Sequence, residues 1–130
     1  MSNQPEVVLD ASALLAFLFQ EAGGGRVERA LESSLICSVN WAEVVQKSLA
    51  RSVNVERAMA YLSDVGLEVI PFSEKDAFVA AHIWLESTAS GLSLADRSCI
   101  ALARRLDLPV LTADRAWGQV PLDVDVQLIR

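Results

Sequence analysis

The sequence predicts an α/β fold with three layers, in which a central, mostly parallel five-stranded sheet is covered by helices on both faces. Two patterns indicate this fold. Five short apolar segments are separated by segments of helical periodicity, and the apolar segments are continuous runs, which is typical of strands buried on both faces. The length of 130 residues and the hydrophobic share of 52% fit one compact domain spanning residues 1–130.

The chain is predicted to start with a strand and a short helix. The run VVLD at residues 7–10 is expected to be a buried strand, and the helix Ser12–Gln20 follows it. The glycines at 23–25 are expected to end that helix, because glycine weakens helices and permits tight turns. A second helix is predicted over Arg26–Ser33 and a second strand over Leu35–Ser38.

The middle of the chain is predicted to contain two helices and the third strand. Asn40 is expected to begin a helix whose apolar stripe, spaced by three and four residues, faces the core. The stripe consists of Trp41, Val44, Val45, Ser48 and Leu49. A further helix is predicted over Val55–Val65, and the strand Leu67–Pro71 is closed by its proline.

The last part of the chain is predicted to contain two helices and two strands. The inward face of the helix Ser73–Thr88 is expected to consist of Ala77, Ala81, Trp84 and Leu85. After a loop at residues 87–91, Ser93 is expected to cap a helix. Its inward face consists of Ala95, Cys99, Leu102, Ala103 and Leu106. The last two strands are predicted over Leu108–Thr112 and Val124–Ile129.

Acidic residues lie close to the ends of the predicted strands. Asp10 and Asp114 each come at or just after a strand. Glu43 lies in the helix after the second strand, and Asp96 lies in the first turn of the helix that leads to the fourth. Because the carboxyl ends of parallel strands meet at one edge of the sheet, where such sheets bind ligands, we expect these four carboxylates to meet there.

Each of these acids, taken alone, has a simpler interpretation as a helix cap. Asn40-x-x-Glu43 and Ser93-x-x-Asp96 resemble capping boxes, and Asp10 and Asp114 are candidates for single caps. The four together favour a metal site. Asp10 has apolar neighbours, and a buried carboxylate is unfavourable unless it is paired or binds a metal.

Oxygen ligands without His or Cys favour a hard ion such as Mg²⁺ or Mn²⁺, which commonly binds a few carboxylates together with substrate phosphate. The pattern therefore indicates phosphodiester chemistry. His82 is the only histidine and lies within a predicted helix away from these acids, so no Ser-His-Asp or Cys-His mechanism is available. The glycines at 23–25 lack the Lys-Ser/Thr sequence of a phosphate-binding loop.

Four segments carry a resemblance to a known family: VVLDASALLAFL, SVNWAEV, LSLADRSCIALARRLDLPVLTADRAW and the final strand. Together they resemble PIN-domain ribonucleases, most closely the VapC toxins of bacterial toxin–antitoxin pairs. The resemblance implies a PIN-like fold with metal-binding, catalytic acids at Asp10, Glu43, Asp96 and Asp114 and supporting polar residues at Ser12 and Thr112. It also implies a Mg²⁺- or Mn²⁺-dependent endoribonuclease that forms a homodimer and is blocked by a co-encoded antitoxin.

The net charge of −6 argues against a broad basic surface for nucleic acid. RNA contacts are therefore expected from local cations, first Arg97 and Arg115, which each follow a proposed site acid, with Arg104 and Arg105 behind them. The alternative is that these arginines are only solvated charges. By the resemblance, the helices predicted over residues 26–33 and 55–65 are candidates for the antitoxin contact.

The remaining observations concern the class of protein. No apolar run is long enough to span a membrane, the N-terminus lacks the pattern of a signal peptide, and Cys37 and Cys99 fit buried free thiols. We therefore expect a cytoplasmic protein. A receiver domain would need an acid after the third strand, and a haloacid-dehalogenase-like phosphatase would need an aspartate where Ser12 stands. The alternative that remains is a non-catalytic PIN-like protein-binding module.

Overall fold

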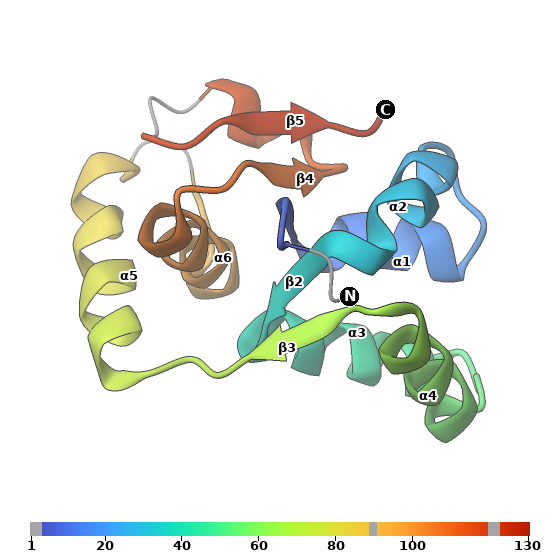
Figure 1. Ribbon diagram of the computed structural model, residues 1–130. Helices are drawn as coiled ribbons and strands as arrows, with labels where there is room; N and C mark the ends of the chain where they lie inside the picture. The colour runs from blue at the N-terminus through green and yellow to red at the C-terminus, as the bar shows by residue number, and fades with distance from the viewer. Residues whose placement is uncertain (1–3, 89–90, 120–122) are drawn as a thin grey trace.

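The structure is a computed structural model that describes residues 4–88, 91–119 and 123–130. Its centre is a five-stranded sheet in the order β3-β2-β1-β4-β5, and all four strand pairs are parallel (Figure 1). The strands are β1 (Val7–Leu9), β2 (Ser34–Cys37), β3 (Glu68–Ile70), β4 (Val110–Thr112) and β5 (Val126–Leu128). The predicted α/β class with its five strands is confirmed, and the carboxyl ends of the strands lie along one edge.

The described residues form six α-helices and two short 3₁₀ helices. The α-helices are α1 (Ala11–Leu18), α2 (Gly24–Ala30), α3 (Ser38–Ala50), α4 (Val55–Val65), α5 (Glu74–Glu86) and α6 (Leu94–Leu106). The 3₁₀ helices are η1 (Leu31–Ser33) and η2 (Arg115–Gln119). None of the helices in the described ranges combines the length and apolar character that crossing a bilayer requires.

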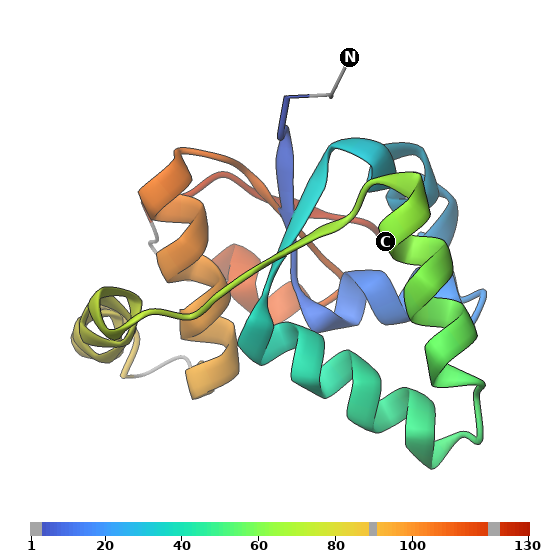
Figure 2. The same ribbon diagram turned by 60° about the horizontal axis from the view of Figure 1, so that its bottom comes forward.

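Helices cover both faces of the sheet (Figure 2). Val7 and Leu9 of β1 pack against residues of α1 to α4, whereas Val8 packs against residues of α5 and α6, because successive side chains of a strand point to opposite faces. Helix α6 lies between the sheet and α5 (Figure 1), and residues 98–103 of α6 are all buried. The three-layer arrangement expected from the sequence is therefore present.

The turn between α1 and α2 requires glycine at two neighbouring positions, Gly23 and Gly24, since a Cβ atom at Gly24 would lie 2.6 Å from the carbonyl oxygen of Ala16. Gly23 precedes α2 with a φ of +89°, and a Cβ atom there would lie 2.6 Å from the carbonyl oxygen of Ile129. Both the left-handed backbone and this close approach exclude larger residues. A break between the two helices is present as predicted, but its position differs: α1 ends at Leu18, and Gly24 and Gly25 belong to α2, which was predicted to start at Arg26. The turn packs against the chain that follows β5.

Helix α3 differs from its prediction in its start and its buried face. It begins at Ser38, directly after β2, so Asn40 lies inside the first turn and the capping-box interpretation of Asn40 is wrong. Its fully buried residues are Asn40, Val44 and Ser48, whereas Leu49 is 62% exposed. The apolar pattern misled because a polar residue, Asn40, takes an inward position and donates a hydrogen bond to the Ala95 carbonyl oxygen of α6 (3.0 Å).

Helix α5 is rotated relative to the predicted orientation. Its buried positions are Asp76, Ala80 and Ile83, and the residues that were expected to face inward are exposed: Ala77, Ala81, Trp84 and Leu85. The cause is polar. The Asp76 carboxylate completes the capping box of α5 with Ser73 and accepts a hydrogen bond from Arg105 Nε of α6 at 3.0 Å. This contact turns the Asp76 side of α5 toward α6.

We predict that Asp76→Ala destabilises the fold by about 1–3 kcal/mol, because it removes the carboxylate half of the capping box and the buried partner of Arg105. Burial raises the pKa of Asp76, but hydrogen bonds from Ser73 and Arg105 outweigh that effect and hold the pKa below its ordinary value. The stabilising contribution is therefore present above about pH 4 and is lost as the pH falls further. Urea unfolding across this range measures it.

The matched control is Glu74→Ala, which removes an exposed acid from the same helical turn. Its expected effect is about 0.3–1 kcal/mol, the size of a helix-dipole interaction. Equal losses in the two variants would show that Asp76 does not orient α5.

Candidate active site

The carboxylate of Asp10 lies at the junction of β1 and α1 and is only 4% exposed. As the N-cap of α1 it accepts a hydrogen bond from the Ala13 backbone N–H (2.8 Å). The hydroxyls of Ser12 and Thr112 donate to its oxygens at 2.8 Å and 2.6 Å. Asp10 is therefore both a helix cap and a buried anion held in a fixed orientation.

The same two hydroxyls join α1 to the end of β4. The backbone N–H of Ala113 donates to Ser12 Oγ (2.9 Å), and that of Asp114 donates to Thr112 Oγ1 (3.0 Å). The residues named from the sequence as supporting polar groups, Ser12 and Thr112, thus both lie against Asp10 and link two neighbouring chain segments at this edge of the sheet.

Asp96 lies in the first turn of α6, where it forms the predicted capping box with Ser93. Its backbone N–H donates to Ser93 Oγ (3.1 Å), and its carboxylate oxygen Oδ2 accepts from the Ser93 N–H (2.9 Å). The negative charge of Asp96 contributes to raising the pKa of Asp10. Asp96 is therefore a cap that also lies within electrostatic reach of the buried carboxylate.

Glu43 lies one turn into α3, beside the start of α6. The Asn40 amide donates to Glu43 Oε1 (3.3 Å) and to the Ala95 carbonyl oxygen (3.0 Å). Asn40 is buried, with 1% exposure, so its amide orients Glu43 toward the turn that carries Asp96. The sequence interpretation of Asn40 as a cap missed this role.

The thiol of Cys99 lies within electrostatic reach of three of the acids. Its thiol is fully buried and donates to the Leu9 carbonyl oxygen at 3.9 Å, beneath the end of β1. Burial raises the pKa of Cys99 well above its ordinary value, and the negative charges of Asp10, Asp96 and Glu43 raise it further. These three carboxylates therefore act electrostatically on the same buried atom.

Asp114 follows β4 and is more exposed than the other three acids. Its Oδ1 accepts a hydrogen bond from the Ala116 N–H (2.9 Å) at the start of η2, as a capping side chain does. Its own backbone N–H donates to Thr112 Oγ1, whose hydroxyl donates to Asp10. Asp114 is thus connected to Asp10 through one intervening hydroxyl.

The charge of this edge suits a divalent cation. Burial raises the pKa of Asp10 to about 6, even though hydrogen bonds from Thr112, Ala13 and Ser12 lower it, and the charge of Asp96 adds to the rise. A cation beside Asp10 would favour its ionised form. The side-chain donors at this edge are oxygens, which fits Mg²⁺ or Mn²⁺. Within the described ranges, no three His, Cys, Asp or Glu side chains already converge as a metal-binding group.

The arginines named as RNA contacts have different environments. Arg97 is half-buried and donates to the Ala80 carbonyl oxygen of α5 (2.9 Å). Arg104 forms an ion pair with Glu86 at 3.0 Å, which joins α6 to the end of α5. Arg105 forms the ion pair with Asp76, also at 3.0 Å. Arg115 remains exposed beside Asp114. The side chains of the other three arginines point toward α5, because α5 packs on α6 and supplies their partners.

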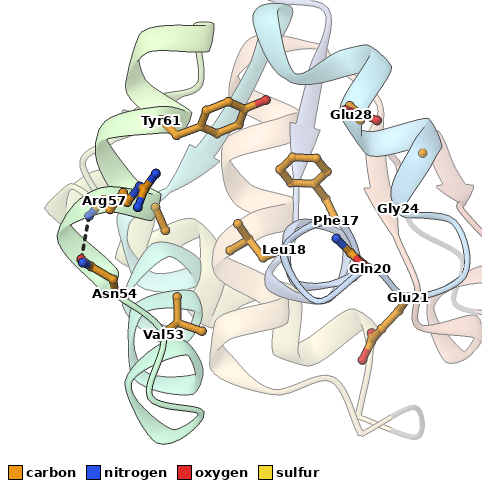
Figure 3. A pocket seen from close by; sticks show the side chains of 12 residues that line it. Phe17, Leu18, Gln20, Glu21, Gly24, Glu28, Val53, Asn54, Arg57 and Tyr61 are labelled. Carbon is orange, nitrogen blue, oxygen red and sulfur yellow. Dashed lines mark hydrogen bonds between the residues drawn. The ribbon is translucent and has the colours of Figure 1, made fainter.

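A groove of about 730 Å³ lies elsewhere on the molecule, between α1, α2 and α4 (Figure 3). Its apolar walls include Phe17 and Leu18 of α1 and Tyr61 of α4, and the Phe17 and Tyr61 rings are stacked with centroids 6.4 Å apart. Glu28 and Arg57 lie at its sides. The sequence had indicated α2 and α4 as a partner surface but not the contribution of α1.

Comparisons with known proteins agree on the fold. A family model described as PIN domain matches residues 7–122. Among solved structures, a toxin–antitoxin complex from Klebsiella pneumoniae superposes with a TM-score of 0.79 at 18% identity, covering 96% of this chain and 98% of that chain. A DNA-bound VapBC from Salmonella typhimurium has a TM-score of 0.71 at 18% identity, with 98% and 100% covered. VapC20 of Mycobacterium tuberculosis, described as a sarcin-ricin loop cleaving toxin, has a TM-score of 0.67 at 15% identity, with 90% and 96% covered. No curated protein matches the sequence.

We predict that Asp10→Asn removes a pH-dependent loss of stability from the metal-free protein. Because the folded-state pKa is about 6 and the ordinary value is 3.8, the folded state holds a proton that the unfolded chain releases between these values, and stability falls as the pH rises through this window. The loss is at most about 3 kcal/mol for a shift of this size. Asparagine cannot ionise, so the variant should lack it.

Urea unfolding of both proteins in EDTA, from pH 4 to pH 7, measures the difference between their free energies of unfolding. The contributions of the other titrating groups are the same in both proteins and cancel in this difference. As the pH rises, the free energy of unfolding of the variant should increase relative to that of the wild type. If the free energy of unfolding of the wild type instead increased relative to that of the variant over this pH range, the raised pKa of the buried Asp10 would be contradicted.

Proposed function

Because the chain belongs to the PIN domain family, we propose that it is a Mg²⁺- or Mn²⁺-dependent endoribonuclease and the toxin of a type II toxin–antitoxin pair. One observation carries the proposal most strongly. A buried carboxylate with a raised pKa, Asp10, lies at the carboxyl end of the central strand with further acids around it. In a parallel α/β sheet this edge is the expected ligand site.

The proposed metal ligands, which are also the proposed catalytic residues, are Asp10, Glu43, Asp96 and Asp114. When bound, a divalent ion would supply positive charge that neutralises the scissile phosphate and lowers the pKa of an attacking water. The chain's own contribution is orientation. Ser12 and Thr112 hold the Asp10 carboxylate, and a backbone N–H holds one oxygen of Asp96, so these groups need little rearrangement to bind an ion.

Neither His82 nor Cys99 offers a side-chain base or nucleophile at this edge. His82 lies exposed on α5, where its Nδ1 is hydrogen bonded to the Phe78 carbonyl oxygen. Cys99 is buried and its pKa is raised, which disfavours the thiolate. The proposal therefore assigns the hydrolytic chemistry to water and metal.

The second candidate is a non-catalytic PIN-like binding module. It is favoured by the observation that Asp10, Asp96 and Asp114 each cap a helix, which gives them a structural role without metal. Capping uses only some of the carboxylate oxygens, however, so the two roles are compatible. Metal-dependent cleavage distinguishes the two functions.

Partners are part of the same proposal. Toxin–antitoxin complexes among the similar structures support a cognate antitoxin, for which the groove between α1, α2 and α4 offers apolar walls. The resemblance to VapC toxins supports a homodimer. Phe78, Trp84 and Leu85 form an exposed apolar surface on α5 that suits such a contact. We also propose that the protein acts in the cytoplasm and that Arg115 contacts RNA.

We predict cleavage of single-stranded or loop RNA with Mg²⁺ or Mn²⁺ and none in excess EDTA. Asp96→Asn should lower the rate by two or more orders of magnitude, because it weakens metal binding at the proposed site. The matched control is Glu74→Gln, since Glu74 lies, like Asp96, in the first turn of a helix but away from the four acids. Its rate should equal that of the wild type. Cleavage that persists in EDTA, or equal rates in the two variants, would refute the assignment.

We predict that Tyr61→Asp weakens binding of the antitoxin encoded beside this gene by at least about tenfold, because it places a charge in the apolar groove. Because Tyr61 is half-exposed, the substitution should leave the fold intact. Leu49→Asp changes a similarly exposed residue of α3 that does not line the groove, and its affinity should be unchanged. Calorimetric titration measures both. Wild-type affinity in Tyr61→Asp would exclude the groove as the contact.

A further inference from the structure

A second hollow, of about 380 Å³, lies directly beside the candidate active site. It is formed by α1, by the last turn of α3 and by the end of the chain. Ser12 lines it at one end, and the Ser12 hydroxyl donates to the Asp10 carboxylate at 2.8 Å. The hollow therefore shares a residue with the network that holds the buried acid.

Three cations line this hollow: Lys47, Arg51 and Arg130. Lys47 follows Glu43 by four residues and Arg51 follows Lys47 by four, and this spacing places them on one face of the helical turn. The same face of α3 thus presents first a proposed metal ligand and then two positive charges. Arg130 reaches the hollow from the chain after β5.

Two of the three cations, Lys47 and Arg51, are available for an anion. All three residues are exposed, and in the described part of the chain Lys47 and Arg51 have no ion-pair partner. The Arg51 guanidinium lies over the Phe19 ring, 4.2 Å from its centroid, which leaves its N–H groups free at the edge. Arg130 is partly engaged, because its Nη1 donates to the Ala22 carbonyl oxygen at 3.1 Å and lies 3.5 Å from Glu21 Oε1. Glu21 is the one acidic residue that lines the hollow.

We propose that this hollow binds RNA backbone phosphates next to the scissile phosphate and so positions the substrate, an inference that rests on the proposed nuclease function. A strand approaching four carboxylates is repelled, so it needs cations close to the site. Arg97, Arg104 and Arg105 are engaged with α5. Lys47 also complements the negative end of the α3 dipole, but that role does not account for Arg130, which comes from another part of the chain.

The test is the binding of a fluorescent single-stranded oligouridylate, followed by anisotropy in EDTA over a range of monovalent salt. Lys47→Gln and Arg51→Gln together should raise Kd by about tenfold. They should also reduce the slope of log K against log salt by about 1.4, because each lost phosphate contact on a single strand removes about 0.7. Lys47→Arg, which keeps the charge, should bind like the wild type.

The matched control is Lys75→Gln, which removes an exposed cation from α5. It should keep the wild-type Kd and salt slope. In the cleavage assay with Mn²⁺, the Lys47 and Arg51 variants should raise KM with little change in kcat, as expected for residues that position RNA without touching the reacting atoms.

The outcomes separate this inference from the proposed function. Metal-dependent cleavage with unchanged RNA binding in the Lys47 and Arg51 variants would overturn the inference and leave the function standing. Salt-dependent RNA binding that needs these residues, in a protein that cleaves nothing, would support the inference and refute the nuclease. Variants that keep RNA affinity but lose antitoxin affinity would show that the hollow receives protein, and no RNA binding by the wild type would also overturn the inference.

Discussion

The burial of one ionisable group, Asp10, is the constraint on which the geometry of this sheet edge depends. The carboxylate ends the central strand, begins α1 and is held by hydroxyls from α1 and β4. A capping carboxylate at the surface has its pKa lowered by the N–H groups that donate to it, whereas burial raises that of Asp10 to about 6. The hydrogen bonds and the neighbouring chain segments are arranged around a charge that the fold alone does not favour, which is typical of a functional site.

Much of the fold could be predicted because apolar runs and helical periodicity are local properties. The helix over Val55–Val65 has the predicted bounds, and all five strands occur where expected. The failures share one cause. Asp76 of α5 and Asn40 of α3 occupy inward positions because each binds a group on α6. A pattern of apolar residues cannot show that a polar side chain has a buried partner more than 25 positions away in the sequence.

The candidate site was predictable to a similar extent. The sequence places the acids near strand ends, and the structure brings Asp10, Asp96 and Glu43 within electrostatic reach of Cys99; their role as metal ligands stays a prediction. The direction of Arg97 depends on how α5 packs, so the sequence could not indicate it. The role of Lys47 and Arg51 could be predicted only in part. Their four-residue spacing from Glu43 is visible in the sequence, but the chain end that completes the hollow is not.

The position of β1 in the middle of the sheet determines when the site can form during synthesis of the chain. Strand β1 pairs with β2 on one side and with β4, about a hundred residues later in the sequence, on the other. Thr112, which holds Asp10, and Asp114 are brought to the site by the pairing of β1 with β4. The hydrogen-bond network around Asp10 therefore cannot close before residues 112–114 have been synthesised, although Asp10, Glu43 and Asp96 precede them in the chain.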